Sequence, residues 1–376
     1  MEYMAAELGI WLSRCIPVPL GDSFPQNRID YIMNHCGSPL MLTPDVMDVI
    51  CTFAPGRGEV PDGNDRAFLL YTSGSTGNPK GVLIGFETLD NGVPRCLAPD
   101  VPMDSVVFGC SAPLYFAFGN IVWNVLHAGG VLHMYSEDVK NDVRLMEDYI
   151  LEHGITISQI SPAVLTMFRN KSPELTTVIT SGEKLTTQYS RDGYTLYNLY
   201  GQTETMHPTI CYRMPEHPMD VIPIGKCMWG VEFKVADGDG NALPQGQIGE
   251  MCLKGLLFRE YFREPELTAE AFRDGWLHTK DLVYTDGNGD IIYVNRMDWM
   301  VKVNGQRVEP GEVESAIRCI DGVTGAVVKG FDGKGGSQYL CAYFTGEGDI
   351  EGERIREILT ERLPSYMVPS YQRQKL

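Results

Sequence analysis

The chain has 376 residues, which is enough for two or three domains around a large hydrophobic core. Hydrophobic residues make up 43% of it and charged residues 21%, values that are ordinary for a globular protein in water. The formal net charge of −18 disfavours nucleic acid and anionic membranes as partners, although it leaves ATP possible. No apolar run approaches the ~18 residues of a membrane span, and the run at 8–12 is too short for a signal peptide.

Ten cysteines occur along the chain, and none forms a C-x-x-C pair. The sequence therefore predicts neither a zinc site nor a redox motif. Most of the cysteines lie in apolar or mixed segments, so we expect buried free thiols in a reducing cytoplasm.

The first 225 residues contain patterns of both helices and strands. Residues 1–56 alternate the two, and a polar loop is predicted at 57–65. From 66 to about 225, apolar strand-like runs alternate with amphipathic helical runs, which predicts a parallel α/β sheet. In the region 1–56 an example is a helix at 28–33. In the region 66–225 the examples are a strand at 131–135, a helix at 144–152 and a strand at 155–157.

From 226 the strands become short and are joined by glycine-containing turns at 237–240 and 286–290, a pattern typical of an antiparallel β unit. After about 297, the sequence predicts a helix at 308–320 and strands at 324–328 and 340–344. The predicted fold class is α/β: a large N-terminal domain of parallel α/β sheets plus an antiparallel β unit, followed by a small α+β C-terminal domain. The predicted boundaries are 1–225, 226–297 and 298–376.

The segment 71–81 carries the strongest chemical signal, because it combines three glycines, four serine or threonine hydroxyls and Lys80. Apolar runs at 67–70 and 82–84 flank it, which predicts strand, flexible loop, strand. Such a loop offers backbone N–H groups, hydroxyls and a cation to a polyphosphate. It is not a P-loop, because Lys80 follows Pro79 where that motif has a glycine. Composition alone leaves a Gly/Ser-rich linker as the alternative, although the flanking apolar runs argue against it.

A second chemical segment, 198–205, places Tyr200 and Glu204 four residues apart. An aromatic ring at the end of a strand can stack on a purine, and a nearby carboxylate can coordinate Mg²⁺ on phosphates. The alternative is the start of a helix that Thr203 caps.

The segment 71–81 resembles the phosphate loop of the adenylate-forming superfamily, which comprises adenylation domains of nonribosomal peptide synthetases, acyl-CoA synthetases and luciferases. Five further segments resemble motifs of this superfamily in the expected order, and the resemblance covers nearly the whole chain. They are an early helix and turn at 9–30, a Gly-Gly-Glu loop at 180–185, the adenine and metal segment at 198–205, the ribose segment at 275–281 and the hinge segment at 296–309. The runs at 78–81 and 363–369 favour the peptide-synthetase branch.

The resemblance implies roles for individual residues. Those that would bind ATP or AMP are Thr72, Ser73, Gly74, Ser75, Thr76, Gly77, Lys80, Gly182, Asn198, Tyr200, Gly201, Thr203, Asp281 and Arg296. Thr72, Lys80 and Glu204 would be catalytic, and Glu204 would hold Mg²⁺. Tyr200 would stack on adenine, and Asp281 would accept both ribose hydroxyls. Asp298 would be the hinge of a rotating small domain, and Gly305 would approach the site only after that rotation.

Two positions depart from the family pattern. Gln202 replaces a proline, at a position to which we assign no chemistry. Lys280 replaces a glycine, and its side chain costs roughly 1 kcal/mol or more if the position needs a positive φ. We expect Asp281 to keep its place.

The implied reaction has two halves. A carboxylate attacks the α-phosphate of ATP to give an acyl-adenylate and pyrophosphate, and a thiol on a carrier-protein phosphopantetheine or on CoA then displaces AMP. The implied cofactors are ATP, Mg²⁺ and phosphopantetheine, and the implied partners are a peptidyl carrier protein and a condensation domain within a larger synthetase. A free-standing acyl- or aryl-CoA ligase and a non-catalytic nucleotide-binding remnant are the alternatives.

The acid pocket implied by the resemblance has no carboxylate. Adenylation domains for amino acids place an aspartate after a Phe-x-Phe-like stretch, whereas Gly119 stands here. The implied lining is Phe118, Gly119, Asn120, Trp123, Gln159, Ile179, Ser181, Leu199, His207 and Pro208. An unpaired buried ammonium group costs several kcal/mol, so we expect a hydroxy, keto, aryl or β-amino acid rather than an ordinary α-amino acid. The alternatives are a one-residue slip in the alignment, a decayed pocket, plain core roles for Trp123 and Leu199, and a backbone contact for His207.

The superfamily's N-terminal segment and the segment with its mobile catalytic lysine have no counterpart in this sequence, and Lys375 lies in the wrong context to replace that lysine. We therefore expect ATP binding but weak or absent adenylation by the chain as given. Extending the chain with the lysine segment is expected to raise ATP–pyrophosphate exchange. Equal exchange with and without the extension would contradict this expectation.

Overall fold

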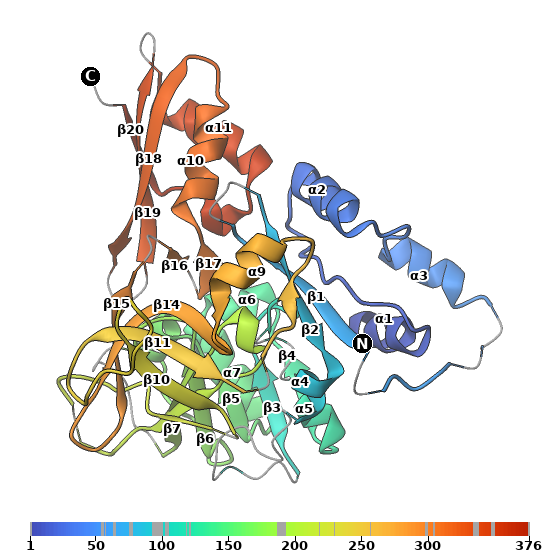
Figure 1. Ribbon diagram of the computed structural model, residues 1–376. Coiled ribbons are helices and arrows are strands. Elements are labelled where there is room, and N and C mark those ends of the chain that lie inside the picture. The colour runs from blue at the N-terminus through green and yellow to red at the C-terminus, as the bar shows by residue number, and fades with distance from the viewer. Residues whose placement is uncertain are drawn as a thin grey trace.

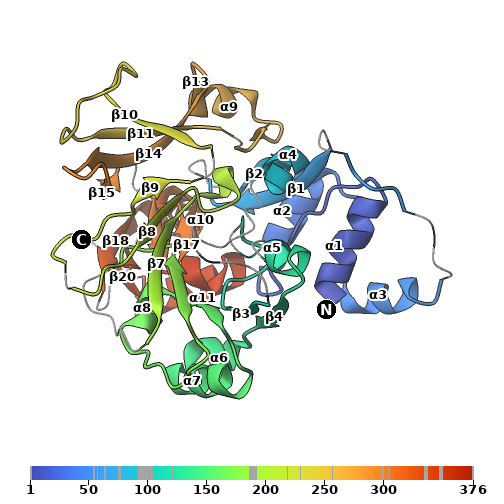
Figure 2. The same ribbon diagram turned by 90° about the horizontal axis from the view of Figure 1, so that it is seen from below.

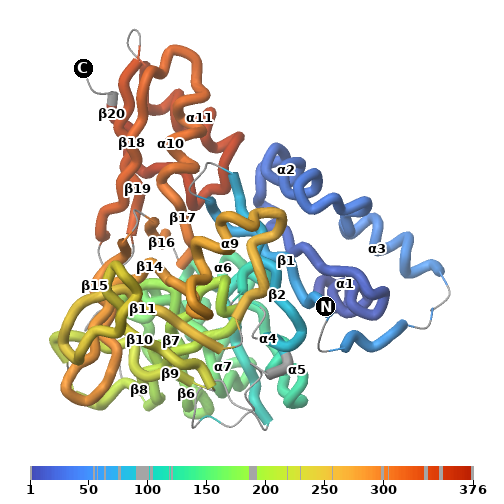
Figure 3. The backbone as a smooth tube through the Cα atoms, in the orientation of Figure 1, coloured from blue at the N-terminus to red at the C-terminus, as the bar shows by residue number. Residues whose placement is uncertain are grey.

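The computed structural model shows a large body and a small C-terminal part that stands against one end of it (Figure 1). The chain ends lie far apart, the N-terminus beside the body and the C-terminus at the far end of the small part (Figure 3). The described residues are 2–53, 56, 58–62, 65–74, 78–91, 101, 105–117, 119, 122–185, 193–217, 219–228, 230–255, 257–297, 300–303, 305–333, 338–346 and 350–374.

A seven-stranded sheet forms the centre of the body. Its strands in spatial order are β4 (Val131–Met134), β3 (Val107–Cys110), β5 (Ile157–Gln159), β6 (Thr177–Ser181), β7 (Thr195–Tyr200), β8 (Ile210–Arg213) and β9 (Lys226–Cys227). The first five run parallel, whereas β8 and β9 are antiparallel to their neighbours. The carboxyl ends of β6 and β7 therefore lie side by side, which brings two of the predicted chemical segments together.

Helices cover both faces of this sheet. They are α5 (Val122–His127), α6 (Glu137–Asn141), α7 (Val143–Glu152) and α8 (Pro162–Leu165). Val178 and Leu196 pack with α7 and α8, whereas Ile179 and Leu199 pack with α5. Successive side chains of a strand point to opposite faces, so a strand buried on both sides must be apolar at nearly every position.

The predicted strand–loop–strand at 67–84 is an antiparallel pair, β1 (Arg66–Thr72) and β2 (Lys80–Gly85), joined by β12 (Glu260–Tyr261). One face, with Phe68 and Val82, packs in a core that includes Trp11, and the other, with Leu69, packs against Ile32. The surrounding helices are α1 (Glu2–Leu12), α2 (Gln26–Cys36), α3 (Pro44–Ile50) and α4 (Phe86–Asn91).

A five-stranded antiparallel sheet forms a separate layer of the body (Figure 2). It contains β10 (Glu232–Ala236), β11 (Gly249–Lys254), β13 (Phe272–Arg273), β14 (Trp276–Thr285) and β15 (Ile291–Arg296), with helix α9 (Pro265–Ala271) beside β13. Asp286 closes the turn between β14 and β15, because its carboxylate accepts the N–H groups of Asn288 and Asp290 at 2.9 Å each.

The small C-terminal part has a core of its own. Its elements are β16 (Val301–Val303), β17 (Gln306–Val308), α10 (Pro310–Arg318), β18 (Val323–Asp332), β19 (Gln338–Gly346), α11 (Gly352–Arg362), the 3₁₀ turn η4 (Ser365–Met367) and β20 (Tyr371–Gln374). Val313 of α10 and Leu359 of α11 pack against Phe344 of the sheet. β18 and β19 pair antiparallel, and β20 joins β19 in parallel.

A buried ion pair joins the small part to the N-terminal helices. Arg28 of α2 contacts Glu312 of α10 at 2.5 Å, and both side chains are almost fully buried. Asn27 adds a hydrogen bond to the carbonyl of Arg362 at 3.1 Å. Undocking would return both charges to water, so the net contribution of this pair to docking is small, whereas replacing one partner alone would leave the other charge buried and unpaired.

The α/β fold class is confirmed, and the structure corrects two of the sequence predictions. Within 66–225 the strands are not all parallel, because β1 and β2 pair antiparallel in a separate sheet and β8 pairs antiparallel with β7. The nine described cysteines are free, but only Cys110 and Cys252 are buried, and Cys15, Cys51 and Cys319 are exposed. No described helix is long and apolar enough to cross a membrane. The domain boundaries stay a prediction; that at 297 falls between β15 and β16.

Lys280 has the positive φ that the sequence suggested, at 61°. A non-glycine residue pays about 1–2 kcal/mol for this conformation, whereas glycine costs about 0.5–1 kcal/mol in chain entropy. We predict that Lys280→Gly raises the free energy of unfolding by about 0.5–1 kcal/mol, measured by urea denaturation. Lys280→Ala is the control, because it removes the exposed ion pair with Glu270 but keeps the Cβ. A glycine variant no more stable than the alanine variant would contradict the prediction.

Candidate active site

A cavity of about 120 Å³ lies where the body meets the small C-terminal part. Its lining comes from widely separated parts of the sequence: Thr72, Phe116, Ala117, Ser181, Gly182, Gly201, Gln202, Thr203, Met206, His207, Pro208, Arg296, Met300, Lys302, Gly305 and Arg307. Each of the predicted phosphate, adenine and hinge segments contributes to it. This convergence marks the cavity as the candidate active site.

The predicted nucleotide-binding residues are only partly gathered here. Those that line the cavity are Thr72, Gly182, Gly201, Thr203 and Arg296. Asn198 does not line the cavity, and its amide donates instead to the carbonyl of Pro223 at 3.0 Å. Ser75, Thr76, Gly77 and the hinge residue Asp298 lie outside the described residues.

The start of the phosphate loop contacts the small part directly. The hydroxyl of Ser73 donates to the carbonyl of Arg307 at 2.9 Å, and the N–H of Gly74 donates to Glu312 at 3.4 Å. In this arrangement, donors that the resemblance assigns to phosphate are used to hold the small part.

The carboxylate of Asp281 is bound by three side chains. Arg296 donates to it at 2.9 Å, Gln202 donates at 2.7 Å, and the hydroxyl of Tyr200 also donates to it. Burial, together with the charge of Asp281, raises the pKa of Tyr200, so this hydroxyl stays protonated. Gln202, to which the sequence assigned no chemistry, therefore positions Asp281 with an amide that proline lacks. Adenine stacking by Tyr200 and ribose binding by Asp281 stay predictions.

Glu204 is the most tightly held acid of the site. It lies in the 3₁₀ turn η2 (Thr203–Thr205), whose N-cap is Gln202, so the alternative in which Thr203 caps a helix was wrong. One oxygen, Oε1, accepts from Tyr261 at 2.7 Å and from Arg307 at 3.2 Å, and Nζ of Lys80 lies 3.4 Å away.

Opposed effects set the charges of this group. Burial opposes ionisation of Glu204, but Arg307 and Lys80 hold the pKa of its carboxyl well below the usual range. Burial, followed by the positive charge of Arg307, lowers the pKa of Lys80 to about 8. Glu204 is therefore an anion at neutral pH, and Lys80 is a cation that gives up its proton readily.

The second carboxylate oxygen of Glu204 fits a metal ion. Oε2 is buried and has no hydrogen-bond partner among the described residues. Buried polar atoms are rarely left unpaired, and a divalent cation would satisfy this one. Mg²⁺ is commonly held by one or two carboxylates together with substrate phosphates, so Glu204 would hold it.

Glycine residues let the small part reach the body at one point. A Cβ on Gly182, which has φ of 94°, would lie 3.2 Å from Cα of Gly305. The N–H of Gly305 donates to Glu183 at 2.9 Å. The loop of Gly305 therefore already lies at the site, the position that the resemblance assigns to the rotated small domain.

The predicted acid-pocket residues divide into two groups. Ser181, His207 and Pro208 line the cavity. Gly119, Trp123, Gln159, Ile179 and Leu199 do not, and Ile179 and Leu199 are buried in the core. Phe118 and Asn120 lie outside the described residues.

Gly119 has no space for the aspartate of amino-acid adenylation domains. A Cβ at this position would lie 2.1 Å from the carbonyl oxygen of Pro113, a separation that side chains do not adopt. The backbone therefore agrees with the missing carboxylate.

A carboxyl group that the sequence did not reveal lies behind Trp123. Glu7 of α1 accepts from the indole N–H of Trp123 at 3.0 Å and is almost fully buried. Burial raises the pKa of Glu7 to about 7, although the hydrogen bond from Trp123 opposes the shift. The contact spans 116 residues, so no local pattern could have signalled it.

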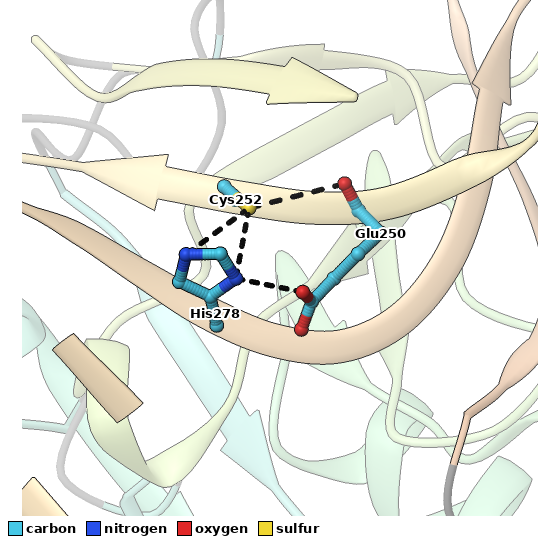
Figure 4. A group of neighbouring side chains, drawn as sticks. All are labelled: Glu250, Cys252 and His278. Atoms are coloured by element: carbon cyan, nitrogen blue, oxygen red, sulfur yellow. Dashed lines mark hydrogen bonds and ion pairs between the residues drawn. The ribbon is translucent and has the colours of Figure 1, made fainter. Parts of the chain in front are cut away.

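Glu250, Cys252 and His278 form a second buried polar cluster, on the antiparallel sheet (Figure 4). Cys252 of β11 pairs with His278 of β14, whose Nδ1 lies 2.7 Å from Glu250 and 3.5 Å from the Cys252 sulfur. This donor set suits zinc. The guanidinium of Arg273, however, lies 2.6 Å from the same ring nitrogen and would repel a cation there.

The cluster instead supports the ribose segment. The other oxygen of Glu250 accepts the backbone N–H of Lys280 at 3.0 Å. Glu250 thereby holds the positive-φ residue that precedes Asp281, and His278 holds Glu250.

Residues 1–262 match the family described as "AMP-binding enzyme". The chain belongs to this family. Zwittermicin A synthase ZmaJ of Bacillus cereus is 30% identical over 98% of this chain and 79% of its own length. Tyrocidine synthase 2 of Brevibacillus parabrevis is 31% identical over 94% of this chain. The chain spans only 11% of tyrocidine synthase 2 and 7% of bacitracin synthase 1 of Bacillus licheniformis.

Solved structures share the fold. The o-succinylbenzoate CoA synthetase of Bacillus subtilis superposes with a TM-score of 0.87 at 21% identity, over 100% of this chain and 82% of that one. Amide bond synthetase McbA of Marinactinospora thermotolerans superposes with a TM-score of 0.85 at 20% identity, over 99% of this chain and 84% of that one. The resemblance to adenylate-forming enzymes and the expectation of an AMP-forming ligase are confirmed at the level of the family. The roles of single site residues stay predictions.

We predict that Arg307→Met raises the pKa of Lys80 above its value of about 8, because a neighbouring positive charge is lost. The Lys80 signal in NMR of ¹³C-labelled lysine, assigned with Lys80→Arg, should titrate at higher pH in the variant. A lysine whose pKa is lower in the folded than in the unfolded state destabilises the fold at neutral pH, and this effect fades as pH rises through 8. The variant should therefore gain less stability than the wild type between pH 7 and 9.

Arg318→Met is the control, because Arg318 is half exposed and pairs with Glu314 on α10. An unchanged Lys80 titration in Arg307→Met would contradict the assigned network.

Proposed function

We propose that this chain serves the activation of a carboxylic acid with ATP as an acyl-adenylate and the transfer of the acyl group to the phosphopantetheine thiol of a carrier protein, with weak adenylation until the lysine segment is supplied. The supporting observation is the single cavity in which Thr72, Arg296 and the loop of Gly305 meet. Thr72 comes from the segment that the resemblance assigns to phosphate, and Arg296 and Gly305 come from the segment that it assigns to the hinge.

In the first half-reaction an oxygen of the acid attacks the α-phosphorus, and the bond to pyrophosphate breaks. Lys80, a cation 3.4 Å from Glu204, would offset charge on the departing pyrophosphate. Mg²⁺, held by Glu204, would neutralise further phosphate charge when bound. Arg296 and Asp281 would fix the ribose side, so catalysis would rest on positioning and charge rather than on acid–base chemistry.

The observed arrangement suits the second half-reaction. Lys302, Gly305 and Arg307 of the small part line the cavity together with Thr72. The carbonyl of Arg307 accepts from the hydroxyl of Ser73 at 2.9 Å, so the docked small part uses a donor that the resemblance assigns to the phosphates of ATP. This contact supports a state from which pyrophosphate has departed, and hence thiol attack on the acyl carbon with departure of AMP.

The choice of thiol rests on the relatives. The sequence relatives named above are synthases of zwittermicin A, tyrocidine and bacitracin. A solved structure of a four-domain nonribosomal peptide synthetase bound to AMP and glycine is 28% identical to this chain. It superposes with a TM-score of 0.66 over 99% of this chain and 30% of that one. We therefore propose a peptidyl carrier protein and a condensation domain as partners. The substrate would be a hydroxy, keto, aryl or β-amino acid, since no carboxylate is found among the described residues that line the cavity.

The nucleotide half of this proposal predicts separable effects on binding. By calorimetry, Asp281→Asn should weaken AMP binding about tenfold or more, because a charge-assisted contact is lost. Glu204→Gln should weaken ATP–Mg²⁺ binding while leaving AMP binding nearly unchanged. Glu232→Gln, at an exposed ion pair with Lys254, is the control. Equal AMP affinity in wild type and Asp281→Asn would contradict the assigned ribose site.

Supplying a chemically prepared acyl-adenylate tests the thiol half, because this step bypasses ATP chemistry. The chain should speed thioester formation on a holo-carrier protein more than on CoA. Preference for CoA would identify a CoA ligase, and nucleotide binding without any thioester would identify a non-catalytic remnant. Either result would overturn the proposal.

A further inference from the structure

Strand β14 leaves the regular pairing of its sheet just before Asp281. It pairs with β11, and the register between the two strands changes after Glu250. Residues 279–281 of β14 therefore lie opposite the single residue Met251 and form a β-bulge. Bulges next to active sites commonly re-aim a side chain, and this one ends with the carboxylate that the resemblance assigns to ribose.

The conformation of the bulge depends on Lys280 at its centre. The φ of this residue, 61°, is unfavourable for a residue with a side chain, so neighbouring groups must maintain it. Its carbonyl accepts the N–H of Met297 at 2.8 Å, and its own N–H donates to a carboxylate oxygen of Glu250 at 3.0 Å. Because Lys280 has no paired residue on β11, the Glu250 side chain supplies the acceptor that a strand would otherwise provide.

Glu250 is held in place at its other oxygen. That oxygen lies 2.7 Å from Nδ1 of His278, as Figure 4 shows, and 3.5 Å from a guanidinium nitrogen of Arg273. Glu250 and His278 are both buried. A buried carboxylate with partners at one oxygen presents the other oxygen in a fixed position, which suits it to hold a strained backbone.

The bulge reaches the cavity through Asp281. Asp281 is buried behind the lining, but its carboxylate accepts from Arg296 at 2.9 Å and from Gln202 at 2.7 Å, and both of these side chains line the cavity. A change in the bulge would therefore move Asp281 and the two cavity side chains that it anchors.

We propose that Glu250 is a positioning residue for recognition of the nucleotide sugar: by accepting the N–H of Lys280, it holds the bulge in the conformation that places Asp281 at the cavity wall. The inference rests on the proposed function and adds to it a residue on a neighbouring strand. Glu250 acts through the backbone of Lys280 and needs no contact with the nucleotide.

The test compares AMP with 2′,3′-dideoxy-AMP, which lacks both ribose hydroxyls, by calorimetry on the whole chain. The ratio of the two affinities separates the contact with the hydroxyls from general damage to the site. In the wild type, AMP should bind about tenfold or more tightly than the dideoxy analogue, because hydrogen bonds to a carboxylate are strong. Asp281→Ala gives the ratio that remains without this carboxylate.

Glu250→Met removes the acceptor but keeps a long side chain. It should lower the ratio to about threefold or less while changing the affinity for the dideoxy analogue less than about twofold, because the lost contact affects only the hydroxyls. Glu250→Gln keeps an acceptor oxygen and should retain most of the ratio. Glu270→Gln is the matched control, because Glu270 contacts the side chain of Lys280 at 3.0 Å whereas Glu250 binds its N–H.

Urea denaturation shows whether each variant is folded. Glu250→Ser replaces Glu250→Met if the methionine variant does not fold, because its short side chain also cannot reach the N–H of Lys280 and leaves room for water. The same low ratio is expected from it.

Three results would overturn the inference: a ratio in the Glu250 variant that equals that of the wild type, equal losses of affinity for both nucleotides, or an equal fall of the ratio in Glu270→Gln. Equal losses would show a merely structural role. Failure of the wild type to bind AMP would overturn the proposed function and this inference with it, so the two failures are distinguishable.

Discussion

The ionised carboxylate of Glu204 is the group on which the rest of the site depends. A buried charge is tolerated only when other groups pair with it and donate to it. Lys80 of β2, Tyr261 of β12 and Arg307 of β17 do so, and these three strands belong to three different regions of the chain. One carboxylate therefore ties the phosphate-loop hairpin and the small C-terminal part to the turn that follows β7.

Docking of the small part decides the shape of the cavity. Arg307, Lys302 and Gly305 of the small part line it together with Thr72, Ser181 and His207 of the body. Under the proposed function, selection of the acid would reside on the rigid body and thiol access at the junction. Oε2 of Glu204 has no hydrogen-bond partner among the described residues, whereas Arg307 donates to the other oxygen, Oε1. Repulsion between Arg307 and a metal ion would link metal binding to the position of the small part.

Local sequence patterns were sufficient to predict the features that depend on residues close together in the sequence. The strands on both sides of the loop at 71–81, the turn of Asp286 and the positive φ of Lys280 were all predictable, because apolar runs, turn residues and a missing glycine are visible in the sequence. Contacts between residues far apart in the sequence were not predictable. Gln202 binds Asp281 across 79 positions and Glu7 binds Trp123 across 116, and no spacing rule links such residues. The prediction that most cysteines are buried was also wrong, because apolar neighbours in the sequence do not place a side chain inside the core.

The sequence by itself determined the fold class, the family and the set of segments that carry the chemistry, because these depend on residue type and order along the chain. Only the tertiary structure decided which of those residues meet: Arg307 with Glu204, Gly305 with Gly182, and Gln202 with Asp281. The physical reason is that pairing a buried charge and satisfying a buried polar atom depend on neighbours in space. Those neighbours are set by the packing of separate sheets and of the small C-terminal part, which no local sequence pattern specifies.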